Sequence, residues 1–301
     1  MDDFFDRAFS RRYLPQWLVA GGLVLLVVAG FVWWIQVYEN PYNVWWGMLA
    51  NSLATSSDTK HIVEDSAATR LDQYVGQEFG VNTLAYGRTT LVSAGNTVTT
   101  ETIGTTVDDY VRYTAIKSSQ KGKNGQPLNF ATVLGKWART PATDSSTPFL
   151  SQTMLGLGGG NLVPMADLTA PQRQNLLTQL HQSDIFDTSF VNVQKHKLNG
   201  RLVYTYAVDV EPVAYVALEK AFAADVGLHA LDSFDPNSYQ GQPAIKVELS
   251  VDVRSHRLAE VSYVGTNHQE FFSGYGVPLG FNVPHASLSA QTLQSRLSQI
   301  E

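Results

Sequence analysis

The sequence predicts an α+β domain that follows one N-terminal transmembrane helix. Residues 17–35, WLVAGGLVLLVVAGFVWWI, form an apolar run without a single charge. Behind this run, strand-like and helix-like stretches follow one another without the regular strand–helix alternation of a parallel sheet. We therefore expect an antiparallel sheet with helices gathered against one of its faces.

The apolar run has the length of a membrane span. Its nineteen residues, at about 1.5 Å each, cover roughly 28 Å, close to the ~30 Å hydrocarbon core. Trp17 stands at one end, and Trp33, Trp34 and Tyr38 stand at the other, as interfacial aromatic residues do. Bulky residues occupy the place where a cleavage site needs small ones, so we expect an uncleaved signal anchor.

Basic residues predict the orientation of this single span. Arg7, Arg11 and Arg12 precede it, and the next basic residue is Lys60. The positive-inside rule therefore places the N-terminus in the cytoplasm and the rest outside the cell membrane. We expect three parts, a cytoplasmic tail, a transmembrane helix and an extracytoplasmic α+β domain, at residues 1–16, 17–38 and 39–301.

Helical and strand-like patterns divide the extracytoplasmic part. Asn40-Pro41 ends the first helix, because a residue before proline avoids the α region. Apolar residues at helical spacing predict further helices, and alternation or β-branched residues predict strands. The expected helices are 44–53, 168–180, 212–225 and 287–300, and the clearest expected strands are 97–106, 109–118, 189–197, 201–210, 244–253 and 257–264.

Composition excludes several classes of function. The net charge of −6 leaves no basic stripe for phosphates, so we expect no nucleic-acid partner. The chain has no cysteine, which removes disulfides, thiolate metal sites and cysteine nucleophiles.

No motif in the sequence indicates an enzyme. No two histidines lie within ten residues of each other, and there is no G-x-S-x-G elbow. The stretches 57–60 and 118–121 fit S-x-x-K, but the companion motifs are missing and both are expected to be loops. Asp108-Asp109 is expected at a turn rather than as a catalytic pair. We predict a non-catalytic protein without cofactor or metal.

The C-terminal third resembles the LolA/LppX-LprG type of bacterial envelope lipid carrier. A hairpin, VDVRSHRLAEVSY (251–263), is followed by EFFSGYGVPLGFNVP (270–284) and a helix. The matching positions are Asp252, Leu258, Val261, Phe272, Tyr275, Gly276 and Pro284. The resemblance implies a strongly curved antiparallel sheet, a half-barrel, with helices in its concavity and an apolar cavity between them.

A lipid-binding function follows from this resemblance, with one departure. Family members are usually cleaved, whereas this chain is expected to keep its anchor. We therefore expect local extraction, presentation or handover of a lipid or another hydrophobic ligand at the membrane surface. The residues expected to line the cavity alternate along two strands, and the same alternation also fits ordinary core. They are Leu202, Tyr204, Tyr206, Ile245, Val247, Leu249 and Val251.

Two other classes of function stay open at this stage. The first is an envelope interaction or assembly module that binds protein or cell wall, and it predicts a filled interior. The second is a hydrolase whose site is scattered in the sequence.

The glycine run LGLGGGNLVP (155–164) does not meet the requirements of a nucleotide loop. No buried strand precedes it, and the next helix begins only near Thr169. We expect Gly158, Gly159 and Gly160 to form a flexible flap at the mouth of the cavity.

Overall fold

The computed structural model describes residues 14–123, 125–144 and 148–300. Most of the predicted cytoplasmic tail, including Arg7, Arg11 and Arg12, lies outside the described residues. The orientation that those arginines predict therefore stays a prediction.

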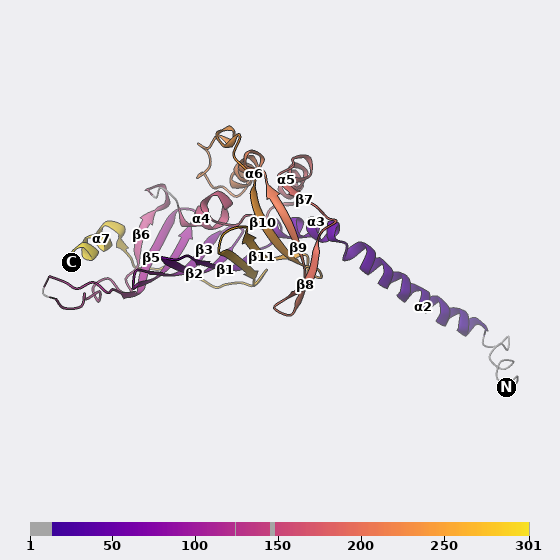
Figure 1. The fold of residues 1–301 in the computed structure, drawn as a ribbon, viewed down its shortest axis with the longest axis horizontal. Coiled ribbons are helices and arrows are strands. Elements are labelled where there is room, and N and C mark those ends of the chain that lie inside the picture. The colour runs from indigo at the N-terminus through magenta and orange to yellow at the C-terminus, as the bar shows by residue number, and fades with distance from the viewer. Residues whose placement is uncertain (1–13, 124, 145–147, 301) are drawn as a thin grey trace.

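The N-terminal helix extends away from the domain (Figure 1). Helix α2 (Leu14–Trp33) continues through one π-helical turn, η1 (Trp34–Tyr38), and the chain then bends into α3 (Pro41–Ser52). Within the described residues no single helix is long and apolar enough to cross a membrane. Taken together, Gly22–Tyr38 and Pro41–Ser52 have the length and apolar composition of a span, but the two are bent by 71° at the break between them. The transmembrane helix at 17–38 stays a prediction.

One large, curved and open sheet forms the body of the described domain. Its order is β13-β6-β5-β4-β3-β2-β1-β12-β11-β10-β9-β7, with β8 beside β9, and every pair except β13–β6 is antiparallel. The α+β class and the antiparallel sheet predicted from the sequence are confirmed. The strands are β1 (Ser57–Asp65), β2 (Thr69–Glu78), β3 (Leu84–Ser93), β4 (Asn96–Thr105), β5 (Asp108–Lys117), β6 (Ala138–Pro141), β7 (Phe186–Thr188), β8 (Gln194–Leu198), β9 (Arg201–Val210), β10 (Ile245–Asp252), β11 (Arg257–Tyr263), β12 (His268–Ser273) and β13 (Leu288–Ser289).

The pairing of β1 with β12 joins the two halves of the chain. Lys60 stands opposite Phe272, and Ile62 stands opposite Glu270. The sheet is therefore continuous, although its two groups of strands are separated in sequence by the helices.

Most helices gather on one face of this sheet, as the sequence predicts. Helix α3 contacts β10 and β11, α4 contacts β3 and β4, and α5 packs on α6. Helix α7 lies beside β6, near the opposite end of the molecule from α2 (Figure 1). The remaining helical elements are α4 (Phe149–Met154), α5 (Ala170–Gln182), α6 (Pro212–Asp225), α7 (Ala290–Ser298), η2 (Ala142–Asp144), η3 (Gly156–Gly158) and η4 (Pro236–Tyr239).

Helix α3 supplies the centre of the core. Asn40 caps it by accepting a hydrogen bond from the Tyr42 amide, and Pro41 occupies its first turn. Trp45 is 2% exposed, and its ring lies 5.2 Å from the Tyr206 ring, between centroids. The packing of Trp45 onto the domain, rather than into a membrane, agrees with the helical spacing of 44–53.

We expect Trp45→Ala to lower the free energy of unfolding by about 3–5 kcal/mol, because a buried indole leaves a large cavity. Tyr42→Ala is the control, since Tyr42 lies in the same helix but is exposed; it should cost about 1 kcal/mol. Denaturant unfolding of the full chain in detergent measures both. Equal losses would contradict the central place of Trp45.

Candidate functional site

Five of the seven residues predicted to line a cavity are core residues. Leu202 is half-buried and Ile245 is 40% exposed. None of the seven borders the hollows described below. A ligand role for these residues stays a prediction, because in the described structure they pack in one cluster with α3. The five that belong to this cluster are Tyr204, Tyr206, Val247, Leu249 and Val251.

Three tyrosine hydroxyls connect this cluster to the base of α2. Tyr206 donates to the carbonyl of Pro41 (2.8 Å), and Tyr204 donates to the carbonyl of Glu39 (3.0 Å). Tyr38, in η1, donates to the carbonyl of Arg254 (2.9 Å). Burial raises the pKa of Tyr206, so this hydroxyl stays a donor. We call Tyr38, Tyr204 and Tyr206 the tyrosine clamp.

The glycine run is packed against the core rather than free. The Gly160 amide donates to the Leu155 carbonyl (3.1 Å), and a Cβ at Gly160 would lie 2.6 Å from the Gln152 carbonyl oxygen. Gly158 ends η3, and Gly159, with φ +83°, is exposed and free of close neighbours. The residues that follow at 161–163 are buried. A gating role for Gly158, Gly159 and Gly160 stays a prediction.

A fourth glycine meets α6. A Cβ at Gly156 would lie 1.8 Å from the Tyr215 hydroxyl oxygen, which itself donates to the Leu162 carbonyl (3.1 Å). The Gly156 amide donates to a carboxylate oxygen of Glu219 (3.0 Å). Glycine is therefore required here by the close approach of the helix, and not by backbone freedom.

We expect Gly156→Ala to destabilise the chain by about 1–3 kcal/mol through overpacking against Tyr215. Combined with Tyr215→Phe, which removes the clashing oxygen, it should cost less than the two single changes added together. Thermal or denaturant unfolding of the wild type, the two single variants and the double variant completes this double-mutant cycle. If the losses of stability in the two single variants simply add in the double variant, the Tyr215 hydroxyl is not what prevents a larger residue at position 156.

Two adjoining hollows lie where the ends of α4 and α6 face turns between strands. The first has a volume of about 420 Å³ and faces the β2–β3 turn. The second has a volume of about 260 Å³ and faces the β4–β5 turn. Val226 and Gly227, neighbours in the chain, border one hollow each, so the two adjoin. We call this pair the rim hollows.

The rim hollows combine an apolar floor with polar edges. Met154 and Leu168 lie in the first, Leu150 and Leu228 lie in the second, and all four side chains are buried. Polar residues border the openings, and they are Asp167, Gln172 and Asp225 in the first hollow and Ser151 and His229 in the second. No sequence pattern identified this site, because its residues come from short turns and helix ends far apart in the chain.

A seam of buried polar side chains crosses the interior between the sheet and the glycine run. Lys60 Nζ lies 3.3 Å from Glu270 Oε2, and Asn161 Nδ2 donates to Gln77 Oε1 (2.8 Å). We call this set the polar seam. Its members are at most 2% exposed, and they are Asp58, Lys60, Gln77, Asn161, Glu219 and Glu270.

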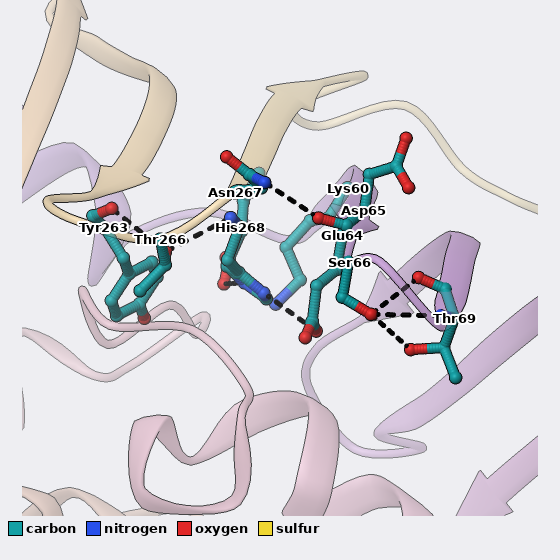
Figure 2. A network of polar contacts seen from close by, with 10 residues as sticks. Lys60, Glu64, Asp65, Ser66, Thr69, Tyr263, Thr266, Asn267 and His268 are labelled. Atoms are coloured by element: carbon teal, nitrogen blue, oxygen red, sulfur yellow. Dashed lines mark hydrogen bonds and ion pairs between the residues drawn. The ribbon is translucent and has the colours of Figure 1, made fainter.

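His268 connects the polar seam to the surface. Its Nε2 lies 2.9 Å from Glu270 Oε1. Its Nδ1 lies 3.5 Å from Glu64 Oε2, and Figure 2 shows His268 and Glu64 side by side. The hydrogen bond with Glu270 raises the pKa of His268, which favours the charged imidazolium beside the two carboxylates. A line of alternating charges thus runs from exposed Glu64 to buried Lys60.

Burial changes the protonation of two carboxyl groups of the polar seam. It raises the pKa of Asp58 to about 7, although Lys60 lowers it in part. It raises the pKa of Glu219 to about 8, against the opposing effect of the Gly156 amide. Both groups therefore hold a proton far above the pH at which an exposed carboxyl releases it.

The seam does not bring a nucleophile to a base. Ser57 and Lys60 belong to strand β1, which corrects the loop expected at 57–60, and their spacing places them on opposite faces. Ser57 Oγ donates to the Val277 carbonyl (2.8 Å). Among the described residues, no three His, Asp or Glu side chains gather as metal ligands. A signal in the sequence could have revealed that Asp58 and Lys60 point into the interior. Both alternate with a two-residue period with Ile62 along β1, and all three side chains are buried.

The raised carboxyl pKa values predict how stability depends on pH. The folded chain keeps these protons up to about pH 7 for Asp58 and about pH 8 for Glu219, whereas the unfolded chain releases them near 3.8 and 4.5. Their stabilising effect is full below pH 4 and is lost as pH rises toward 8. In the wild-type protein Asp58 should lower the free energy of unfolding by on the order of a few kcal/mol between pH 5 and 8, and Asp58→Asn should remove this decrease.

Asp65→Asn, at an exposed position of the same strand, is the control and should leave the pH dependence unchanged. Denaturant unfolding at a series of pH values separates the two. A wild-type protein whose stability is flat or rises across this range, with no difference in Asp58→Asn, would contradict the protonated interior.

The comparisons with known proteins find a likeness of fold. No family model matches the sequence, and no curated protein matches it. The crystal structure of LprF from Mycobacterium bovis is similar, at 12% identity and a TM-score of 0.44, over 82% of this chain and 97% of the LprF chain. LprF is of the LppX/LprG type, the same type of protein that the C-terminal motifs resemble.

Proposed function

We propose that this chain is a membrane-tethered, extracytoplasmic module that binds a lipid or another hydrophobic ligand without changing it chemically. The apolar floor of the rim hollows is the observation that carries this proposal. At about 420 and 260 Å³, the two hollows approach the size range of small-molecule sites. Buried Leu150, Met154 and Leu228 offer an apolar surface, while the polar edges orient a headgroup.

The exposed helix α2 supports the tether. Its side chains from Leu23 to Val32 are apolar and exposed, and Leu25 reaches 71%. A helical stretch whose described side chains are apolar and exposed in this way is suited to a lipid environment. Anchored in this way, with its N-terminus in the cytoplasm, the domain extracts, presents or hands over its ligand at one membrane.

The described residues favour binding over catalysis. Four buried ionisable side chains lie in the polar seam, and they are Asp58, Lys60, Glu219 and Glu270. Ser57, outside the seam, points to the opposite face of β1 from Lys60. The rim hollows contain His229, which pairs with Asp232 at the surface (3.0 Å). Neither arrangement supplies a nucleophile next to a base.

A second function is favoured by one observation. Five of the seven residues expected to line a cavity pack in one core cluster with α3, and a filled interior is what an envelope interaction or assembly module predicts. In that case the domain would bind protein or cell wall through its exposed surface, with no small ligand. The experiment below separates the two functions.

Photo-crosslinking with a diazirine fatty acid tests the proposal on the full chain in nanodiscs. We expect crosslinks at the rim hollows, in peptides covering 142–154 and 225–230. Ala142→Leu with Ala230→Leu fills the second hollow and should reduce these crosslinks there roughly tenfold. Ala207→Leu, on an exposed position of β9, is the control and should leave them unchanged.

Crosslinks along α2 are expected in every variant, because bilayer lipid surrounds it. Crosslinks on β9 and β10 would move the ligand to the seven predicted lining residues. Crosslinks on α2 alone would contradict ligand binding and favour the interaction module.

A further inference from the structure

The tyrosine clamp shows which part of the domain lies nearest to the membrane anchor. Along β9, Tyr206 meets Pro41 and Tyr204 meets Glu39, so strand and chain run side by side toward α2. The β8–β9 turn lies four residues beyond Tyr204 in this direction, which is roughly 13 Å at ~3.3 Å per residue. The Asn199-Gly200 turn, with φ +49° and +80°, therefore stands at the end of β9 that lies on the side of Glu39.

The β10–β11 turn lies at the same level. The Val253 amide donates to the Leu202 carbonyl (3.0 Å), which places this turn beside the start of β9. The His256 ring stacks on the Tyr38 ring at 4.3 Å, and Tyr38 stacks on Trp34 at 4.3 Å. Two turns thus flank η1, where the predicted interfacial aromatic residues lie.

These two turns and strand β8 carry exposed basic side chains, which we call the basic cluster. Its members are Lys195, Lys197, Arg201 and Arg254. Only two nearby carboxylates oppose them in the described contacts. Glu39 lies 3.7 Å from Lys195, and Asp252 accepts the amides of Arg254 and Ser255. The local excess of positive charge contrasts with the −6 of the whole chain.

Apolar side chains accompany the basic cluster. Val191, in the loop before β8, is 91% exposed, and Tyr42 is also exposed beside Phe190 (5.2 Å between centroids). Basic residues next to exposed apolar ones, at the level of an interfacial aromatic belt, match the chemistry of an anionic lipid surface.

We propose that the basic cluster binds anionic lipid headgroups of the bilayer that holds α2, and so fixes the domain against the membrane in one orientation. This inference rests on the proposed membrane tether. The bilayer is the occupant, rather than a soluble polyanion, because the tyrosine clamp holds these side chains beside the anchor whatever else is in solution. Only η1 and two further residues separate α2 from α3, so no long linker lies between the anchor and the domain.

A single spin label tests the proposal, because the chain has no cysteine of its own. His196→Cys, between Lys195 and Lys197, is labelled in the full chain and reconstituted in vesicles of neutral lipid or with about 30% phosphatidylglycerol. We expect protection of the label from a water-soluble relaxant in the anionic vesicles only. About 0.5 M salt should reverse this protection.

Removal of charge should shift the docked state. The cluster variant combines Lys197→Gln, Arg201→Gln and Arg254→Gln. Each of the three changes should lower the ratio of docked to undocked protein about fivefold. The matched control is a variant with the same loss of charge near the other edge of the sheet order, Lys117→Gln, Lys121→Gln and Lys123→Gln. It should leave the label protected.

Equal protection in neutral and anionic vesicles would overturn the proposal, and so would a loss in the control as large as in the cluster variant. Flotation after a carbonate wash separates this failure from failure of the tether. A chain that does not float lacks the membrane anchor itself, whereas a chain that floats with an unprotected label lacks only the headgroup contact.

Discussion

The packing of α3 onto the sheet is the interaction on which the rest of the structure depends. Trp45 fills the space over Tyr206, and the hydroxyls of Tyr204 and Tyr206 bind the carbonyls of Glu39 and Pro41 just before and at the start of that helix. One helix therefore closes the core and fixes the direction of α2. A buried phenol must find an acceptor, so these tyrosines hold the chain at a defined place and not only by apolar contact.

This packing divides the helix-covered face into three regions with different chemistry. Near α2 the interior is filled by α3, in the middle the polar seam crosses it, and at the ends of α4 and α6 the rim hollows open. The rim hollows, where we propose that a ligand binds, therefore lie away from the region that α3 fills.

Local patterns in the sequence predict much of the fold. The helix at 212–225 is confirmed with the same bounds, since Pro212 opens it and its apolar residues repeat at helical spacing. Asn199-Gly200 predicts the β8–β9 hairpin because both residues adopt positive φ. The partner of Lys60 could not be foreseen from the sequence, because Glu270 is more than two hundred residues away. The packing of the glycine run depends in the same way on Tyr215, which lies in a later helix.

Native mass spectrometry of the full chain, released from nanodiscs made from its own membranes, tests the central claim most directly. A hydrophobe-binding module is expected to carry one lipid-sized adduct that survives the collision energy needed to strip bulk lipid from α2. The same adduct should be lost when Ala142 and Ala230 are replaced by leucine. A chain that appears only without an adduct at that energy, in every preparation, would contradict ligand binding and leave a tethered interaction module.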